Sequence, residues 1–223
     1  MKLYIVRHGR ALSATGAFNG LDLPELEEES RDFLSEIGLK QAELLGWRLK
    51  DVKFDIAYTS HLPRAVQTAA NILKYQKKQL TLEIFPELSE SGTSADFAVD
   101  EEMIKSVYPK VIFHGRDIKK YGSVEERAGF CVDNLIKKNA YGYDLELSKD
   151  SQGDEVESRN VNVLIVAHAV MNAHLISSIV NFPFDRRMVV SQDNTCVNTF
   201  EFYTVNGEQR MRFLGFNNTD HLK

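Results

Sequence analysis

The sequence lacks the features of several protein classes. Its 223 residues include only two cysteines, Cys131 and Cys196, and neither lies in a CxxC or other zinc-ligand spacing. Two isolated thiols are typical of reduced side chains in a reducing compartment, so we expect a cytoplasmic protein. No apolar run approaches the length of a membrane span. We expect no signal peptide, because Arg7 interrupts the first apolar run.

An excess of basic charge is also missing. The chain has 27 Lys and Arg against 32 Asp and Glu, which gives a net charge of -5. We therefore expect no bulk attraction to nucleic acid or to an anionic membrane. An anionic substrate would need a site that is basic only locally. The apolar fraction of 43% and the charged fraction of 26% are those of an ordinary globular protein, and the length suits one domain.

Short apolar runs alternate with segments of helical spacing. The pattern predicts strands at residues 3–6, 54–60, 80–85 and 163–166, with helices after Ser35, at 64–73 and from His168 to about 180. Two further strands, about 195–204 and 208–216, flank Asn206-Gly207, a pair that favours the positive φ angles of a type I′ turn. This order predicts a three-layer α/β/α sandwich with a mostly parallel mixed sheet.

Two segments depart from the alternation. Residues 91–140 have helical spacing, and Ser123 with Glu126 forms a capping-box pattern. We expect this segment to be a helical cap insertion within a single domain of residues 1–223. Residues 144–160 are highly polar, and we expect them to form a mobile loop.

Charged side chains follow the predicted strands where each one ends. Arg7 and His8 follow the first strand, His168 follows the strand at 163–166, Arg64 begins the helix after the second strand, and Glu90 lies beyond the third. Ligands of open α/β sheets bind beyond the carboxyl ends of the strands. We therefore expect two histidines, two arginines and a carboxylate to meet in one crevice.

These residue types suit phosphoryl transfer. A neutral imidazole is a nucleophile near pH 7 and can carry a phosphoryl group covalently. Guanidinium groups match phosphate oxygens and stabilise the charge of the transition state. A carboxyl group can protonate the leaving oxygen, and a second histidine can donate a hydrogen bond to the transferring group. No metal is required if these groups supply the positive charge.

The residues resemble the histidine phosphatase superfamily, which includes phosphoglycerate mutases and many phosphatases. The first element, "VRHGRA", is similar to the family's Arg-His-Gly motif, and "LSEIGLKQAELLG" is similar to its Leu-Thr-x-x-Gly-x-x-Gln-Ala helix. Three further elements are similar in the family's order: "YTSHLPRAVQTA", "PELSE" and "LIVAHAVM". The resemblance implies the phosphoglycerate mutase-like fold.

The resemblance also implies roles for the matching residues. His8 would be the phosphorylated nucleophile. Arg7 and Arg64 would bind the phosphoryl group, and His168 would complete that pocket. No cofactor or metal is implied.

The proton donor and one phosphate contact are assigned on the same basis. Glu90 would protonate the leaving group, and Glu87, three residues earlier, is the alternative. "FNGLD" is similar to a phosphate-contacting segment of the mutases, which makes Asn19 a candidate contact.

Three functions are compatible with these residues. We expect a metal-independent phosphatase that acts on a small phosphomonoester. A mutase is disfavoured because "SGTSADFA" lacks the Gly-x-Trp/Leu-x-Gly pattern that follows the acidic residue in many relatives. A non-catalytic phosphate-binding or phosphopeptide-binding module is the third possibility. The substrate stays open, as does the oligomeric state, since an exposed sheet edge could pair with a second copy.

Overall fold

The computed structural model describes most of the chain around one mixed sheet. The described residues are 1–13, 32–90, 99–114, 118–141, 146–149, 155–158, 160–182 and 190–223, with the backbone alone at 119, 146–149 and 155–158.

Nine strands of the described residues form the sheet, in the order β4-β3-β2-β7-β1-β8-β6-β5, and β9 pairs with β8. From β4 to β1 neighbouring strands are parallel, and every pairing that involves β5, β6, β8 or β9 is antiparallel. The strands are β1 (Lys2–Arg7), β2 (Ile56–Thr59), β3 (Leu82–Ile84), β4 (Val111–Phe113), β5 (Glu146–Lys149), β6 (Glu155–Ser158), β7 (Asn162–Ala167), β8 (Val197–Val205) and β9 (Glu208–Asn218).

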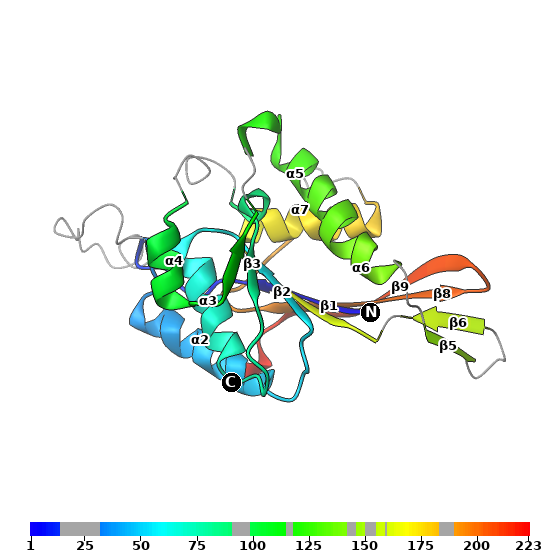
Figure 1. Ribbon diagram of the computed structural model, residues 1–223, viewed down its shortest axis with the longest axis horizontal. Helices are drawn as coiled ribbons and strands as arrows, with labels where there is room; N and C mark the ends of the chain where they lie inside the picture. Colours follow the sequence, from blue (N-terminus) through cyan, green and yellow to red (C-terminus); the bar gives the residue numbers. More distant parts are fainter. Residues whose placement is uncertain are drawn as a thin grey trace.

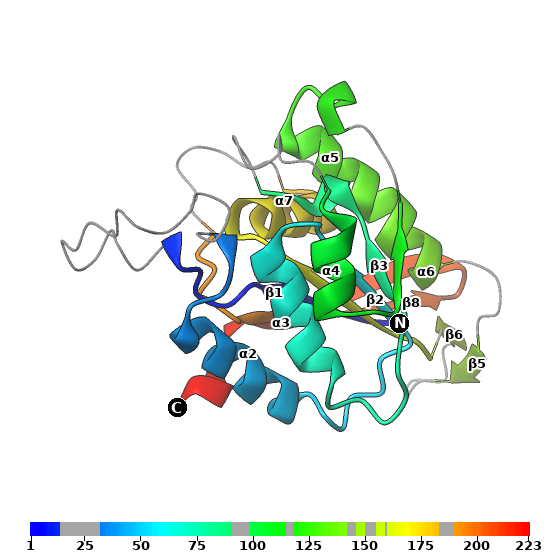
Figure 2. The same ribbon diagram turned by 60° about the vertical axis from the view of Figure 1, so that its left-hand side comes forward.

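Helices cover both faces of the parallel part of the sheet (Figures 1 and 2). One face carries α2 (Glu36–Arg48), α3 (Pro63–Leu73) and α4 (Glu101–Val107). The other carries α5 (Val124–Cys131), a π-helical continuation over Val132–Lys137, α6 (Lys138–Ala140) and α7 (Ala169–Val180). The predicted three-layer sandwich is confirmed. Short 3₁₀ turns lie at Pro86–Leu88, Ile118–Lys120 and Asp220–Leu222.

Alternation along the strands divides the core into two layers. Leu3 and Ile5 of β1 pack with α5 and α7, whereas Val6 packs with α2 and α3. Successive side chains of a strand point to opposite faces, so a strand covered on both faces must be apolar at nearly every position. The strand therefore stays apolar up to Val6 and turns polar where it leaves the two layers.

The helix predicted after Ser35 and the turn predicted at Asn206-Gly207 are both confirmed. The Ser35 side chain caps α2 by accepting a hydrogen bond from the backbone N–H of Gly38 at 3.1 Å, which is typically worth about 1 kcal/mol. Asn206 and Gly207 both have positive φ, 49° and 79°, as the hairpin pattern requires.

Two expectations need correction. Residues 146–149 and 155–158, expected in a mobile loop, form strands β5 and β6, which pair with each other and extend the sheet through β8. Ladder hydrogen bonds between backbones do not require apolar side chains, so polar composition is a poor guide at a sheet edge. Residues 111–113 of the expected helical insertion form β4, the outermost parallel strand.

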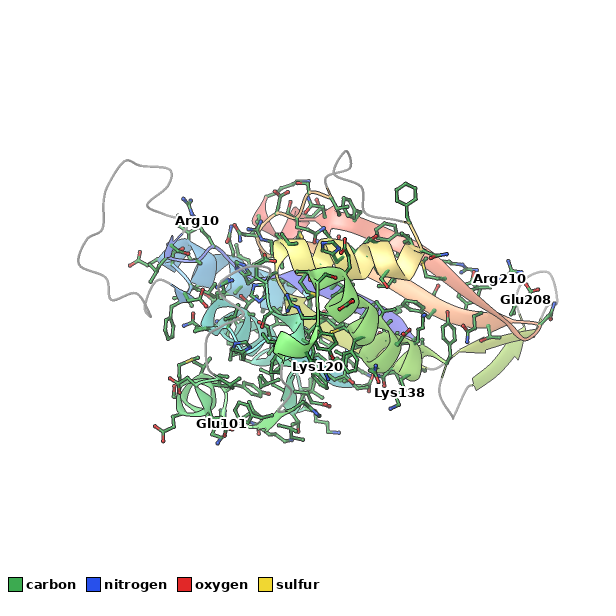
Figure 3. The ribbon with its side chains drawn as sticks, turned by 90° about the horizontal axis from the view of Figure 1, so that it is seen from above. Arg10, Glu101, Lys120, Lys138, Glu208 and Arg210 are labelled. Carbon is green, nitrogen blue, oxygen red and sulfur yellow. The ribbon has the colours of Figure 1, made fainter. Side chains whose placement is uncertain are left out.

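The described helices of that segment lie on opposite faces of the sheet. Ile104 of α4 packs against the layer of α2 and α3, whereas Ala128 and Ile136 pack in the layer of α7. Figure 3 shows Lys120 and Lys138 at opposite ends of the helical run from the Ile118–Lys120 turn to α6. These described helices are thus part of the sandwich itself.

Among the described residues, no helix is both long and apolar enough to cross a bilayer. Both cysteines are buried. No group of three or more His, Cys, Asp or Glu in the described ranges is arranged to hold a metal ion.

Candidate active site

Three neighbouring strands bring polar residues to one edge of the sheet. In the parallel register Arg7 at the end of β1 lies beside Ala167 at the end of β7, and Thr59 of β2 lies beside Val166. The next residues along the chain are therefore close: His8 after β1, Ser60 after β2 and His168 after β7. The ring centroids of His8 and His168 are 5.1 Å apart.

The hydrogen bonds of His8 define its tautomer. Its Nδ1 lies 2.7 Å from the carbonyl oxygen of Gly9, which can only accept a hydrogen bond. Nε2 accepts a hydrogen bond from Nε of Arg64 at 3.2 Å. The ring therefore carries its hydrogen on Nδ1, and the lone pair of Nε2 points toward the guanidinium, where an oxyanion would bind.

Burial and two positive charges keep this imidazole neutral. Burial, the charge of Arg64 and the charge of Arg7 together lower the pKa of His8 to about 3, against the opposing effect of the Gly9 hydrogen bond. Its side chain is available as a neutral nucleophile over the whole physiological pH range.

Arg64 comes from the first turn of α3, whose N1 position is Pro63. Its guanidinium bonds His8 through Nε and forms an ion pair with Asp32 through Nη1. Burial lowers the pKa of Arg64 to about 10, although the charge of Glu90 acts in the opposite direction. The group therefore stays cationic near neutral pH and is oriented by both partners.

His168 lies beside His8, and one of its ring nitrogens contacts Ser60. The hydroxyl of Ser60 accepts from the backbone N–H of Leu62 at 3.4 Å and lies 2.7 Å from Nε2 of His168. Burial and the charge of Arg64 hold the pKa of His168 well below its usual value, so the ring is neutral. In the tautomer in which the Ser60 hydroxyl donates to Nε2, the ring carries its hydrogen on Nδ1. That buried nitrogen has no hydrogen-bond partner in the described part of the chain.

Backbone contacts hold the end of β1 in place. Arg7 donates through Nη1 to the carbonyl oxygen of Gln192, and its buried Nε has no protein acceptor among the described residues. Nδ2 of Asn194 donates to the carbonyl oxygen of His8 at 3.0 Å. The backbone N–H of Thr195 donates to the carbonyl oxygen of Arg7 at 3.1 Å. The segment before β8 therefore fixes the backbone from which both site residues project.

Glu90 lies at the start of α7, next to His168. Its Oε1 accepts from the backbone N–H of Met171 at 3.3 Å, and Oε2 accepts from that of Val170 at 3.4 Å. A carboxylate is favoured at a helix N-terminus because the free N–H groups and the helix dipole attract negative charge.

Figure 3 shows Arg10, a further cationic residue of the motif segment, at the outer edge of the molecule.

Glu87, the alternative proton donor, lies in a different environment from Glu90. Glu87 is fully buried, and the hydroxyl of Tyr121 lies 3.5 Å from its Oε1. Glu87 thus faces the α5 side of the loop, whereas Glu90 faces the pocket rim at α7. Asn19 lies outside the described residues.

Steric contacts explain why glycine follows His8 in the sequence. A Cβ on Gly9 would lie 2.6 Å from the carbonyl oxygen of Gly38 in α2, and a Cβ on Gly38 would lie 2.1 Å from the carbonyl oxygen of Arg10. Two backbones meet here, so neither can yield as a flexible side chain would. Gly9 and Gly38, one in each motif, are therefore required where the end of β1 packs against α2.

Sequence reasoning missed several supporting residues. Thr68 accepts from the backbone N–H of Gly9 at 3.0 Å and donates to the carbonyl oxygen of Arg64 at 2.7 Å, which links the two segments of the pocket. Because Thr68 lies within the element "YTSHLPRAVQTA", the sequence could have identified it as a residue of the site. Asp32 and Asn194 lie outside the quoted motifs, and only the three-dimensional arrangement reveals them.

The assembled groups can bind a tetrahedral oxyanion and accept a group from it. Two guanidinium groups supply positive charge, the neutral Nε2 of His8 supplies a lone pair, and Nδ1 of His168 supplies a donor in the tautomer in which Ser60 donates to Nε2. Donors aimed at one point in a buried site stabilise developing charge without reorganisation.

Comparisons with known proteins agree with this chemistry. The family model of the histidine phosphatase superfamily (branch 1) matches residues 3–218. The chain is 26% identical over 206 residues to the adenosylcobalamin/alpha-ribazole phosphatase of Escherichia coli K12. The aligned region covers 88% of this chain and 87% of that protein.

Two solved structures show the same fold. The phosphoserine phosphatase of Entamoeba histolytica, in complex with 3-phosphoglyceric acid, superposes with a TM-score of 0.58 at 19% identity and covers 100% of this chain and 99% of its own. The phosphoglycerate mutase of Bacillus anthracis superposes with a TM-score of 0.58 at 20% identity, over 100% of this chain and 95% of its own.

Proposed function

The chain belongs to the histidine phosphatase superfamily, and on that basis we propose that it is a metal-independent phosphatase that hydrolyses a small phosphomonoester through phosphohistidine at His8. The single observation that carries the proposal is the arrangement of His8: a neutral buried imidazole whose Nε2 points at a buried guanidinium. That arrangement suits covalent transfer better than simple anion binding, which needs no nucleophile.

The proposed reaction has two steps. Arg7, Arg64 and Nδ1 of His168 bind the phosphoryl oxygens while Nε2 of His8 attacks phosphorus. The bond from phosphorus to the ester oxygen breaks, and the carboxyl group of Glu90 gives a proton to that oxygen. The Glu90 carboxylate then takes a proton from water, which attacks phosphohistidine and releases inorganic phosphate and free His8.

Glu90 is favoured over Glu87 as the acid because its carboxylate adjoins the turn that carries His168, whereas Glu87 is enclosed on the α5 side. Substrate selection is assigned to the segment 91–140, whose described residues Tyr121 and Arg127 contact this loop. A cytoplasmic location, inferred from the two isolated cysteines, is part of the proposal, as is the absence of a nucleic acid or membrane partner.

The test is a panel of phosphorylated metabolites assayed in parallel with the wild type and His8→Ala. We expect phosphate release by the wild type from at least one compound and none by the variant. Isomerisation of 3-phosphoglycerate without net phosphate release would replace the phosphatase with a mutase. Binding of vanadate without hydrolysis of any ester would replace it with a binding module.

A further inference from the structure

The loop that carries the proposed acid is bonded from two sides. It starts with the 3₁₀ turn Pro86–Leu88 and continues to Glu90. On the side of β2, the hydroxyl of Ser89 lies 3.1 Å from Nδ1 of His61, a residue buried beside the pocket. On the other side the loop meets α5.

Arg127 of α5 makes the contacts on that side. Its Nη1 donates to the carbonyl oxygens of Glu87 at 3.2 Å and Ser89 at 2.9 Å. Its Nη2 donates to the carbonyl oxygen of Glu90 at 3.2 Å. One guanidinium thus bonds three of the four carbonyl oxygens between residues 87 and 90, and all three acceptors belong to the backbone.

The burial of this arginine makes the arrangement unusual. Arg127 is only 5% exposed, and burial lowers its pKa while the nearby acidic groups raise it. A buried cation is costly unless its donors are satisfied. A surface role or a simple packing role would not explain a guanidinium whose donors converge on one short loop.

We propose that Arg127 is a positioning residue for the acid: it fixes the backbone of residues 87–90 so that the Glu90 carboxyl group stays at the pocket rim beside α7. The inference rests on the proposed function, because it assigns Arg127 to the proton-transfer step. The carboxylate end of Glu90 is bonded by α7 and its backbone by Arg127, so the side chain is held at both ends. Displacement of a reacting group by about 1 Å can cost about 10²-fold in rate.

The step affected has a distinctive dependence on the leaving group. p-Nitrophenolate leaves as a stable anion and needs little protonation, whereas an alkoxide leaves only with a proton. The value of kcat/KM reports the steps up to the first irreversible one, here phosphorylation of His8. A misplaced acid should therefore lower kcat/KM for alkyl phosphates much more than for p-nitrophenyl phosphate.

The experiment compares Arg127→Lys and Arg127→Met with the wild type on p-nitrophenyl phosphate and on an alkyl phosphate that the wild type hydrolyses. We expect kcat/KM for the alkyl ester to fall by roughly 10- to 10²-fold in the Met variant, and less in the Lys variant, which keeps the charge but not the fork of donors. For p-nitrophenyl phosphate we expect a change of less than about threefold, because the pocket around His8 is intact.

Val132→Ala is the matched control. Val132 is buried in the core layer of α5, so its truncation should lower Tm without touching the loop. The control should reduce kcat/KM for both esters equally, if at all. Equal losses of kcat/KM for both esters in the Arg127 variants would overturn the proposal. Wild-type values of kcat/KM for both esters would overturn it as well. Failure of both Arg127 variants to fold would make Arg127 a folding residue and also overturn it. If the wild type hydrolyses neither ester nor any compound of the panel, the proposed function itself has failed.

Discussion

Replacement of His8 by Asn tests the electrostatic account of the pocket without relying on activity. In the folded protein burial and the neighbouring arginines lower the pKa of His8 from 6.5 to about 3. Between these values the unfolded chain binds a proton that the folded protein does not. The stability supplied by this group is therefore fully present above pH 6.5 and is lost as the pH falls toward 3.

The magnitude follows from the separation between the assay pH and the unfolded pKa. At pH 5 the neutral, buried ring costs the folded state about 2 kcal/mol, because each pH unit below the unfolded pKa contributes about 1.4 kcal/mol. At pH 8 the cost is close to zero. The His8→Asn variant has no such proton. His168 is present in both proteins, and burial and the charge of Arg64, the two largest causes of its lowered pKa, do not involve the substituted side chain.

The assay is urea unfolding of both proteins at pH 8 and pH 5 at one ionic strength. Between these conditions we expect the wild type to lose about 2 kcal/mol more of its unfolding free energy than the variant. The same pH dependence in both proteins, or a larger loss in the variant, would refute the conclusion that the pocket holds His8 neutral.

Further substitutions test individual contacts of the pocket. Arg64→Met should lower kcat by roughly 10²-fold or more, because a buried donor to the transferring group is lost; a steady-state assay that finds wild-type kcat would contradict this. Ser60→Ala leaves Nε2 of His168 buried without its hydrogen bond, so urea unfolding should show a loss of about 1–3 kcal/mol. Glu90→Gln should lower kcat/KM for an alkyl phosphate by about 10²-fold while binding of vanadate, measured by calorimetry, persists; an unchanged rate would move the acid to another residue.

The layers of the fold were predictable because they depend on local rules. Apolar runs and helical spacing identified β1, β7 and α3, and the Asn206-Gly207 pair predicted the hairpin between β8 and β9. Strands β5 and β6 were missed because their ladder is made by backbone groups at a sheet edge, where composition carries little signal. The strand at 111–113 was missed because three residues are too few to show a period.

The site was predictable to the extent that it lies on motifs. His8, Arg64 and His168 follow strand ends, and the parallel register brings strand ends together. Residues that act through another group leave no such trace. Asp32 pairs with Arg64, and Arg127 bonds backbone carbonyl oxygens, so each depends on contacts between segments distant in sequence.

The most direct test of the account is to trap the covalent intermediate. The wild type is mixed with a hydrolysed phosphoester, quenched in alkali, which preserves phosphohistidine, and digested for mass spectrometry. The account predicts a phosphoryl group on the peptide that contains His8, located on that residue, and no label in His8→Ala. A phosphoryl group on any other residue, or hydrolysis by His8→Ala at the wild-type rate, would contradict it.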